Sequence, residues 1–519
     1  MTKKISLSSV FFLQMYSLLT VVLYGGIFLK QCAEDKISAF YLPIVFILIW
    51  QTLFIIFSVL LSHKYLKKIC AALLIGNALV FYAMLAYHTQ IDKIMLMNLL
   101  QTDSAEVTEL LNGQVFACLI GLGIIPAVCL AFCTVTVSPI RQILKSIAVS
   151  LLCIGLLGGI SYQQTNIFLH RFKYLQGYLP PINYLQSSAE LAVHYLTPRP
   201  KLQKISEDIT PPPSKEKPDL IVFIMGETTR AANFSLNGYH RPTNEVLTPY
   251  LNNIIYYPNT QACGTSTAIA VPCIFSVYDR KNFKEGSETY TENILDIFTK
   301  ADYKVRWLDN DGGCKDVCNR VYYEEPCEEK TCRDEILLKN LQQKLENTKD
   351  NQLIVLHTRG SHGPSYHLRY DEDSALYQPI CTDNQLWNCT PEELVNVYDN
   401  TVHYVSKFIA RTIDILKNLQ DKYNPVLIYT SDHGESLKED GVFLHAAPYA
   451  TAPKYQKEVP MLVWMPENNG YHFDINCLKQ KAKENLHSHD NIFHSLLGLT
   501  GIKSEHYQKE LDIFANCKI

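Results

Sequence analysis

Three apolar runs in the sequence end abruptly in residues that can bind a metal ion. The run DLIVFIMGE ends in Glu227, PVLIYTSDHGE ends in Asp432 and His433, and QLIVLHTRGSHGP carries His362 just past its apolar part. Any one of these runs alone is an ordinary buried strand with a polar end. Carboxylates and neutral imidazoles are zinc ligands, so the three together predict a zinc site if the runs converge.

The elements that would bring these side chains together are strands of one sheet. From about Asp219 to Ile519, apolar runs such as YKVRWLDND and VPMLVWMP alternate with helical stretches such as 333–347 and 391–419. This alternation predicts an α/β domain over 219–519 with a largely parallel sheet, and about 300 residues are ample for a core. In such sheets, ligands bind outside the carboxyl ends of the strands.

A hydroxyl-rich segment, CGTSTAIAVPC, places Thr265, Ser266 and Thr267 just before a predicted helix. The free N–H groups and dipole of a helix N-terminus favour phosphate, and a hydroxyl that binds zinc becomes a strong nucleophile. Without the metal motifs, the segment would more often be a helix cap. With them, we expect a nucleophile.

The first third of the chain differs in composition from the rest. Apolar runs lie near residues 9–29, 40–62, 69–87, 115–137 and 143–161, each about the 20 residues that a membrane helix needs. They predict a five-span α-helical membrane domain over residues 1–161. Basic residues in short loops, such as Lys64 and Arg141, face the cytoplasm by the positive-inside rule, so the chain after the fifth span lies on the other side.

Residues 162–218 connect the two domains. The first part mixes aromatic and basic residues, including Arg171 and Tyr178, which is typical of helices at a membrane interface. The segment TPRPKLQKISEDITPPPSKEKP then predicts a proline-rich linker that does not form a core.

Cysteine spacing predicts that the C-terminal domain is in an oxidising compartment. Four close pairs predict small disulfide loops, although zinc ribbons or free thiols are alternatives. The pairs are Cys263 with Cys273, Cys314 with Cys318, Cys327 with Cys332, and Cys381 with Cys389. Cys477 and Cys517 are candidates for a fifth pair, and the six cysteines before residue 160 are expected to pack in or beside the spans.

The ordered motifs resemble one known family. GETTRAANFSLNGYHRPTNE, CGTSTAIAVPC, SHGP, SDHGES and FLHAAPYATAPK follow the five spans. In this order they resemble the phosphoethanolamine transferases of Gram-negative inner membranes, which include lipid A-modifying and mobile colistin-resistance enzymes. The resemblance covers nearly the whole chain and implies an alkaline phosphatase/sulfatase-type domain in the periplasm.

The resemblance also implies roles for individual residues. Thr267 would be the phosphorylated nucleophile, and the zinc ligands would be Glu227, Thr267, Asp432 and His433. His362 and His445 would bind the substrate phosphate or a second zinc ion, and Lys315 would contact the phosphoethanolamine group. Some relatives carry a hydroxyl residue where this chain has Gly312, so one phosphate contact would be missing. Structural alternatives are a capping or core role for His362 and a solvated Lys315.

One polar set belongs to the N-terminal half. Asn98, Thr102 and Glu106 are spaced four residues apart, so a helix would place them on one face within about 80°. They could be the solvated face of a loop helix, but the family has a similar set that reaches toward the ethanolamine amine.

Near the C-terminus, SHDNIFHSLLGL predicts an amphipathic helix, so we expect structural roles for His487, His489, Asp490 and His494.

We therefore expect a zinc enzyme that moves phosphoethanolamine from phosphatidylethanolamine to lipid A or another lipopolysaccharide acceptor through a phosphothreonine. This activity would give resistance to cationic polymyxins. Alternatives are a phosphoglycerol transferase or hydrolase of the same superfamily, and a non-catalytic membrane assembly factor; a sulfatase would need a C-x-P-x-R-like motif, which is absent. The net charge of −4 argues against a nucleic-acid partner, and we expect a monomer.

Overall fold

The computed structural model describes residues 5–35, 37–61, 64–101, 107–108, 110–329 and 332–519. The chain forms two compact units. Unit 1 comprises Met1–Leu96 and Leu111–Leu196, and unit 2 comprises Met97–Leu110 and Thr197–Ile519. Helix α5 (Lys93–Gln101) therefore begins in unit 1 and ends in unit 2.

Unit 1 is helical, and its described residues contain the predicted spans. Four helical segments are long and apolar enough to cross a membrane: Ala39–Leu60, Leu66–Tyr87, Gly113–Phe132 and Ile140–Ile160. A fifth span is complete only if α1 (Ser9–Tyr24) and α2 (Gly26–Glu34), which meet at an angle of 60°, count as one. The predicted membrane domain agrees with this range of four to five spans.

Besides α1 and α2, unit 1 contains α-helices that form these spans or follow the last one. They are α3 (Leu42–Leu60), α4 (Leu66–Tyr87), α7 (Gly113–Cys118), α8 (Ile125–Cys129), α9 (Ile140–Ile160), α10 (Tyr162–Leu175) and α11 (Ile182–Leu196). Two short strands, β1 (Ile5–Ser8) and β2 (Cys133–Thr136), pair in parallel. Exposed apolar side chains on α11, such as Leu185 and Val193, fit the predicted interfacial position.

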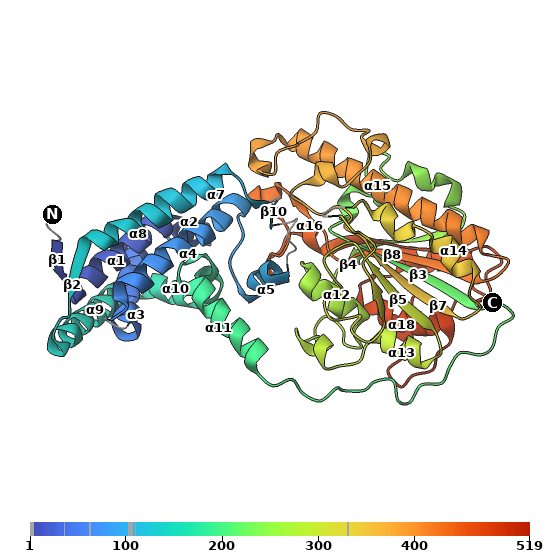
Figure 1. The fold of residues 1–519 in the computed structure, drawn as a ribbon, viewed down its shortest axis with the longest axis horizontal. Helices are drawn as coiled ribbons and strands as arrows, with labels where there is room; N and C mark the ends of the chain where they lie inside the picture. Colours follow the sequence, from blue (N-terminus) through green and yellow to red (C-terminus); the bar gives the residue numbers. More distant parts are fainter. Residues whose placement is uncertain (1–4, 36, 62–63, 102–106, 109, 330–331) are drawn as a thin grey trace. The chain divides into compact units, whose positions relative to one another are not determined.

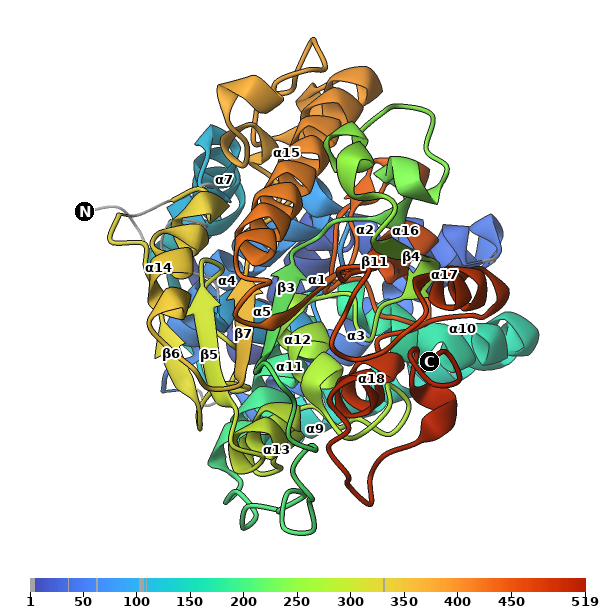
Figure 2. The ribbon, with the colours of Figure 1, turned by 90° about the vertical axis from the view of Figure 1, so that its right-hand side faces the viewer.

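Unit 2 is built on a seven-stranded sheet (Figures 1 and 2). In sheet order the strands are β4 (Ile254–Gln261), β11 (Glu458–Trp464), β8 (Asn424–Ser431), β3 (Asp219–Gly226), β7 (Gln352–His357), β5 (Lys304–Asp309) and β6 (Tyr322–Glu324). The strands from β8 to β6 are parallel and only β11 pairs antiparallel, which confirms the predicted α/β fold.

The central strand β3 is buried on both faces, as its unbroken apolar sequence requires. Ile221 and Phe223 pack into the core beneath α12 (Thr267–Phe275), α13 (Ile294–Lys300) and α18 (Asp490–Thr500), whereas Val222 packs into the core beneath α15 (Pro391–Asn418). Figure 1 shows these helices on opposite sides of the sheet. Other helices and strands of unit 2 include α14 (Leu341–Glu346), α16 (Lys454–Lys457), α17 (Ile475–Glu484), β9 (Ser436–Leu437) and β10 (Phe443–Leu444).

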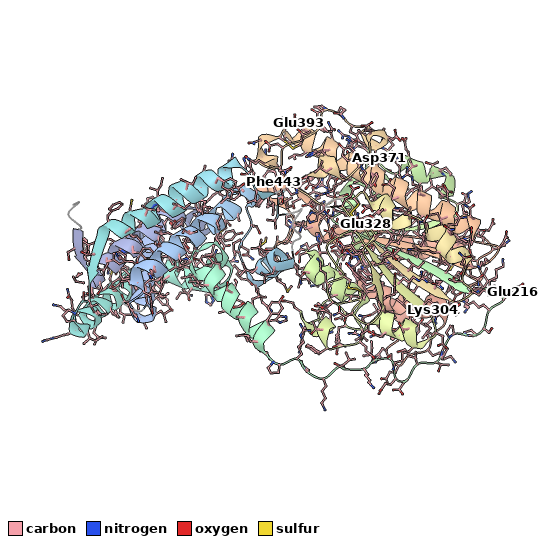
Figure 3. All side chains as sticks on the ribbon, viewed as in Figure 1. Glu216, Lys304, Glu328, Asp371, Glu393 and Phe443 are labelled. Atoms are coloured by element: carbon pink, nitrogen blue, oxygen red, sulfur yellow. A yellow bond between two sulfur atoms is a disulfide. The ribbon has the colours of Figure 1, made fainter. Side chains whose placement is uncertain are left out.

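The parallel strands run in one direction, so their carboxyl ends lie at the same edge of the sheet. Figure 3 labels Glu216, which precedes β3, and Lys304, the first residue of β5, and these mark the amino ends of the two strands. The register pairs Gly226 of β3 with Ser431 of β8, and Met225 with His357 of β7. The residues that follow these three strands therefore emerge together at the carboxyl ends.

Two sequence-based expectations need adjustment. The helix expected over 333–347 is a 3₁₀ turn, Asp334–Leu338, followed by α14, because Asn340 at φ 59° interrupts it.

The expected linker is also more ordered than its composition indicates, since Thr197 and the residues after it belong to unit 2. Ile205 is 5% exposed in the core, and the hydroxyl of Ser206 donates to Glu292.

Five disulfides lie in unit 2. They join Cys263 to Cys273, Cys314 to Cys318, Cys327 to Cys332, Cys381 to Cys389, and Cys477 to Cys517. The last pair is the one that the sequence left open.

Candidate active site

The ends of β3 and β8 and the start of α12 meet at one point. Glu227 follows β3, Asp432 and His433 follow β8, and all three are fully buried. The half-buried Thr267 is the first residue of α12, after the extended N-cap Ser266. Its Oγ1 lies 3.2 Å from Glu227 Oε2 and 3.4 Å from His433 Nε2, so the residues predicted from separate motifs form one cluster.

The cluster has the electrostatics of a cation site. Burial, the Asp432 carboxylate and then that of Asp311 raise the pKa of Glu227 well above its ordinary value. Burial lowers the pKa of His433 to about 4, which leaves its ring neutral near pH 7. Asp432 Oδ2 is buried and accepts no hydrogen bond from the described part of the chain. Buried carboxylates that repel each other, beside a neutral imidazole, are the donor set that zinc accepts.

The backbone orients two of these donors. His433 Nδ1 lies 2.9 Å from the carbonyl oxygen of Gly434, which turns Nε2 toward Thr267. Asp432 Oδ1 accepts the backbone N–H groups of Thr228 at 3.2 Å and His433 at 2.6 Å, which leaves Oδ2 for another partner. Such contacts fix the direction of a ligand before a metal binds.

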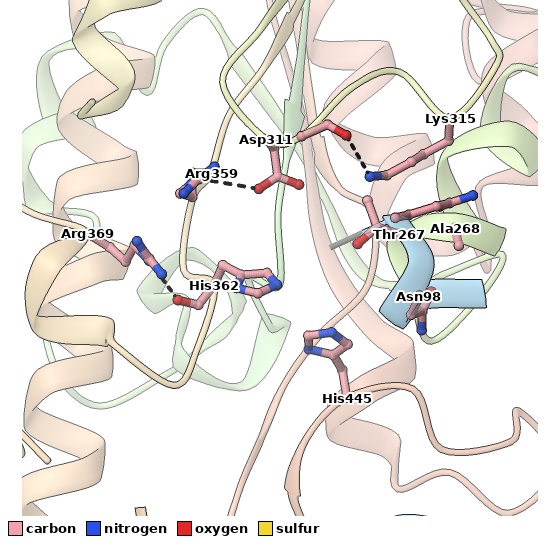
Figure 4. Close-up of a pocket in the computed structure, with 11 residues that line it drawn as sticks. Asn98, Thr267, Ala268, Asp311, Lys315, Arg359, His362, Arg369 and His445 are labelled. Atoms are coloured by element: carbon pink, nitrogen blue, oxygen red, sulfur yellow. Dashed lines mark hydrogen bonds and ion pairs between the residues drawn. The ribbon is translucent and has the colours of Figure 1, made fainter. Parts of the chain in front are cut away.

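A polar cavity opens beside Thr267, and Figure 4 shows the side chains around it. It is lined by Asn98, Gln101, Thr267, Ala268, Asp311, Gly312, Lys315, Arg359, His362, Arg369 and His445. The predicted residues Asn98, Lys315, His362 and His445 are therefore all present. Lys315 Nζ donates to the carbonyl oxygen of Gly312 at 3.0 Å, which directs the ammonium along the cavity wall. Thr102 and Glu106 lie outside the described residues.

The two predicted histidines form a short row with the candidate zinc ligand. The His445 ring centroid is 4.4 Å from that of His433 and 5.4 Å from that of His362. Burial, followed by the neighbouring His445, lowers the pKa of His362 well below its ordinary value. Neutral rings that line a cavity can accept a proton or bind a metal ion.

Several residues of the cavity are not among those predicted from the sequence. Asp311 comes two residues after β5, and Asp432 comes directly after β8, so a similar signal was available in the sequence. Arg359 comes just after β7, but an arginine there has no distinctive pattern. Arg369 lies in a loop, and no feature of the sequence indicates its position.

Glu227, Asp311 and His357 also lie close enough together to share a metal ion. The surroundings of His357 favour a different arrangement. Its Nδ1 is 2.8 Å from Asp309 Oδ2, and its pKa is raised because the Asp309 and Asp311 carboxylates outweigh the effect of burial. A raised pKa favours the imidazolium, which binds no metal, so we interpret this group as a buried ion pair beside the site.

The C-terminal histidines have the structural roles expected of them. His489 accepts the backbone N–H of Cys263 at 3.1 Å and lies 3.1 Å from Thr430 Oγ1. His487 contacts the carbonyl oxygen of Ala482, and His494 accepts the N–H of Gln508. Asp490 accepts the N–H of Arg280, and α18 begins at this residue.

Two family models match the two parts of the chain, in agreement with this geometry. Residues 219–502 match the sulfatase family model, which defines the class of the catalytic unit. Residues 49–196 match the model for phosphoethanolamine transferase EptA/EptB. The chain belongs to the phosphoethanolamine transferase family.

Individual relatives cover most of the chain. Phosphoethanolamine transferase EptA of Escherichia coli (strain K12) is 39% identical over 469 residues, which are 86% of this chain and 85% of that protein. Phosphatidylethanolamine transferase Mcr-1 of Escherichia coli is 32% identical over 536 residues, 96% of this chain and 97% of that one. The structure of the integral membrane lipooligosaccharide phosphoethanolamine transferase A of Neisseria meningitidis superposes with a TM-score of 0.93, at 34% identity and 99% coverage of both chains.

Proposed function

We propose that the chain transfers phosphoethanolamine from phosphatidylethanolamine to lipid A or another lipopolysaccharide acceptor, through a phosphothreonine at Thr267. One observation carries the proposal: the Thr267 hydroxyl is at a helix N-terminus, within 3.4 Å of two side chains that can bind a cation. This arrangement suits a nucleophile that must lose its proton and attack a phosphorus atom.

We further propose that zinc is the resident metal and that Glu227, Thr267, Asp432 and His433 hold it. The orphaned Asp432 Oδ2 and the neutral His433 ring support this assignment. When bound, zinc would lower the pKa of the threonine hydroxyl and neutralise charge on the phosphoryl oxygens.

The chain's own residues account for both halves of the reaction. In the first, Thr267 Oγ1 loses its proton and bonds to the donor phosphorus, the bond to the glycerol oxygen breaks, and that oxygen takes a proton and leaves as diacylglycerol. In the second, an acceptor oxygen bonds to phosphorus, the bond to Thr267 breaks, and the acceptor's proton restores the hydroxyl. In this proposal Lys315, which lines the cavity, holds a phosphoryl oxygen, and His362 and His445 carry protons.

The proposed setting is the bacterial inner membrane, with unit 2 in the periplasm. Addition of phosphoethanolamine puts a cationic amine on an anionic glycolipid, which weakens its attraction for cationic polymyxins. The family comparisons do not favour a phosphoglycerol transferase, and the intact ligand cluster argues against a non-catalytic assembly factor.

Mass spectrometry of lipid A tests the proposal. Expression of the chain in a strain without such an enzyme should add phosphoethanolamine, whereas the Thr267→Ala variant should add none. Trapping of the covalent adduct on Thr265 or Ser266 would overturn the assignment of the nucleophile.

A further inference from the structure

A second cavity of about 670 Å³ lies directly beside the catalytic one. Its lining includes Arg333, Lys339, Leu368, Arg359 and Arg369. The last two also line the catalytic cavity, so the two spaces share one wall of guanidinium groups.

The second cavity adjoins the catalytic cavity at Arg359 and Arg369, across from Thr267. In Figure 4, Thr267 and Lys315 lie on one side of the catalytic cavity, and Arg359 and Arg369 lie across from them. Phosphoryl transfer places the attacking and leaving oxygens roughly in line through the phosphorus. The departing glycerol oxygen of the first half and the acceptor oxygen of the second would therefore both lie across from Thr267, on the side where Arg359 and Arg369 are found.

The wall between the second cavity and the candidate metal ligands is thin. It includes Gly360, whose positive φ of 50° and close approach leave no room for a side chain: a Cβ atom there would lie 2.6 Å from the carbonyl oxygen of Glu227. The backbone N–H of Gly360 donates to Asp334 at 3.0 Å, which holds this wall in place. A molecule in the second cavity would thus lie close to the reacting centre.

The charge of the second cavity favours an anion. Arg333 and Lys339 are exposed at its rim, and Arg369 is buried at its inner end, only 5% exposed. Two of the lining carboxylates already have partners within the protein. Asp334 accepts N–H groups from Asn310, Arg359 and Gly360, and Glu335 accepts from Arg411 and Tyr404. Among the described lining residues, the remaining carboxylate is that of the exposed Glu329, and Arg359 in turn pairs with Asp311 at 3.9 Å.

We propose that this second cavity is the acceptor subsite, in which Arg333 and Lys339 bind a phosphate group of a phosphorylated-sugar acceptor. The inference rests on the proposed function and adds the place where the acceptor binds. The acceptor oxygen bonds to the phosphorus held on Thr267, the bond from phosphorus to Thr267 Oγ1 breaks with its electron pair, and the acceptor's proton returns to the threonine.

The test separates the two halves of the reaction in the full-length enzyme. The double variant Arg333→Ala/Lys339→Ala should raise the KM for a glucosamine disaccharide lipid that carries a phosphate by about tenfold, as expected for two partly exposed ion pairs. It should leave kcat and the release of diacylglycerol from phosphatidylethanolamine without acceptor unchanged. Lys300→Ala/Lys349→Ala, which removes two exposed cations outside both cavities, is the charge-matched control and should leave that KM unchanged.

A binding measurement makes the result independent of turnover. The Thr267→Ala protein should bind the phosphorylated disaccharide lipid more tightly than its dephosphorylated form, and the added Arg333→Ala/Lys339→Ala change should abolish this difference. Equal affinity with and without the two cations would overturn the subsite while leaving the proposed function intact. A slower release of diacylglycerol in the double variant would instead assign the cavity to the donor. Absence of any diacylglycerol release from wild-type enzyme would contradict the proposed function itself.

Discussion

As the proposed nucleophile, the Thr267 hydroxyl would depend on its neighbours for reactivity, since an isolated threonine is a poor nucleophile at neutral pH. Glu227 and His433 surround its Oγ1 at 3.2 and 3.4 Å, respectively. Thr267→Ala should therefore reduce transfer by at least about a thousandfold, as loss of a covalent nucleophile does. Thr267→Ser, which keeps the hydroxyl, should retain measurable activity. Both are measured as initial rates of diacylglycerol release; wild-type rates for Thr267→Ala would exclude it as the nucleophile.

Gly360 is required by the backbone beside Glu227. Alanine at a positive φ costs about 1–2 kcal/mol in conformational energy alone, and at Gly360 its Cβ would also lie 2.6 Å from the Glu227 carbonyl oxygen. Gly360→Ala should thus lower both stability and bound zinc. Gly238→Ala is the matched control, because Gly238 has φ +92° and no atom within 4 Å of an added Cβ. Urea unfolding and metal analysis should show a loss of zinc in Gly360→Ala only; full zinc content in that variant would contradict the argument.

The disulfides of unit 2 differ in the length of chain that they close. Cys477–Cys517 spans 40 residues, whereas Cys327–Cys332 spans 5. In the chain-entropy model these loops correspond to about 4 and about 2 kcal/mol. Replacement of Cys477 and Cys517 by serine should therefore lower the free energy of unfolding more than replacement of Cys327 and Cys332 by serine. Denaturant unfolding of the two double variants measures the difference, and an equal or reversed order would contradict it.

The packing of α18 against the C-terminal segment contains a buried acid. Burial raises the pKa of Asp512 to about 6, although the Phe514 N–H and the Tyr507 hydroxyl donate to its carboxylate. Because the folded state holds this proton more tightly than the unfolded chain, the contribution of Asp512 to stability is largest below about pH 4. It should be lost as pH rises through about 6, by up to about 3 kcal/mol. Asp512→Asn should flatten this slope between pH 4 and 6.5, and an unchanged slope would mean that Asp512 does not titrate in this range.

The catalytic unit extends beyond the motifs that define it. A fragment that begins at Thr197 keeps Ile205 in the core, the contact of Ser206 with Glu292, and the pairing of Thr210 with Lys503. A fragment that begins at Asp219 loses these, and burial of one isoleucine alone contributes about 1.5–3 kcal/mol. The longer fragment should therefore melt at a higher temperature. Equal melting temperatures would show that the segment contributes nothing to folding.

Lipid transfer should require residues that lie before Thr197, in addition to the part of unit 2 from Thr197 to Ile519. The fragment from Thr197 keeps Thr267, Lys315 and the candidate zinc ligands but lacks Asn98, which lines the catalytic cavity. It should cleave a small soluble phosphoester and fail to transfer from phosphatidylethanolamine. In the full chain, Glu106→Ala should reproduce the loss of transfer while keeping bound zinc. Lipid modification by the fragment at the full-length rate would reduce the N-terminal half to an anchor.

Local physics allowed much of this protein to be predicted from its sequence. A membrane helix needs about 20 apolar residues, and a buried parallel strand needs an unbroken apolar run. The membrane spans and the strands β3, β7 and β8 can therefore be predicted from the sequence. Close cysteine spacing indicated the short loops in the same way. Strand order depends instead on how both faces of the sheet are covered, and only the tertiary structure decided it. That order brings Glu227, after β3, to Asp432, after β8. The packing of loops and helices adds Arg359 and Arg369 to the cavity and joins Cys477 of α17 to Cys517. These contacts join residues far apart in the chain, so no local pattern specifies them.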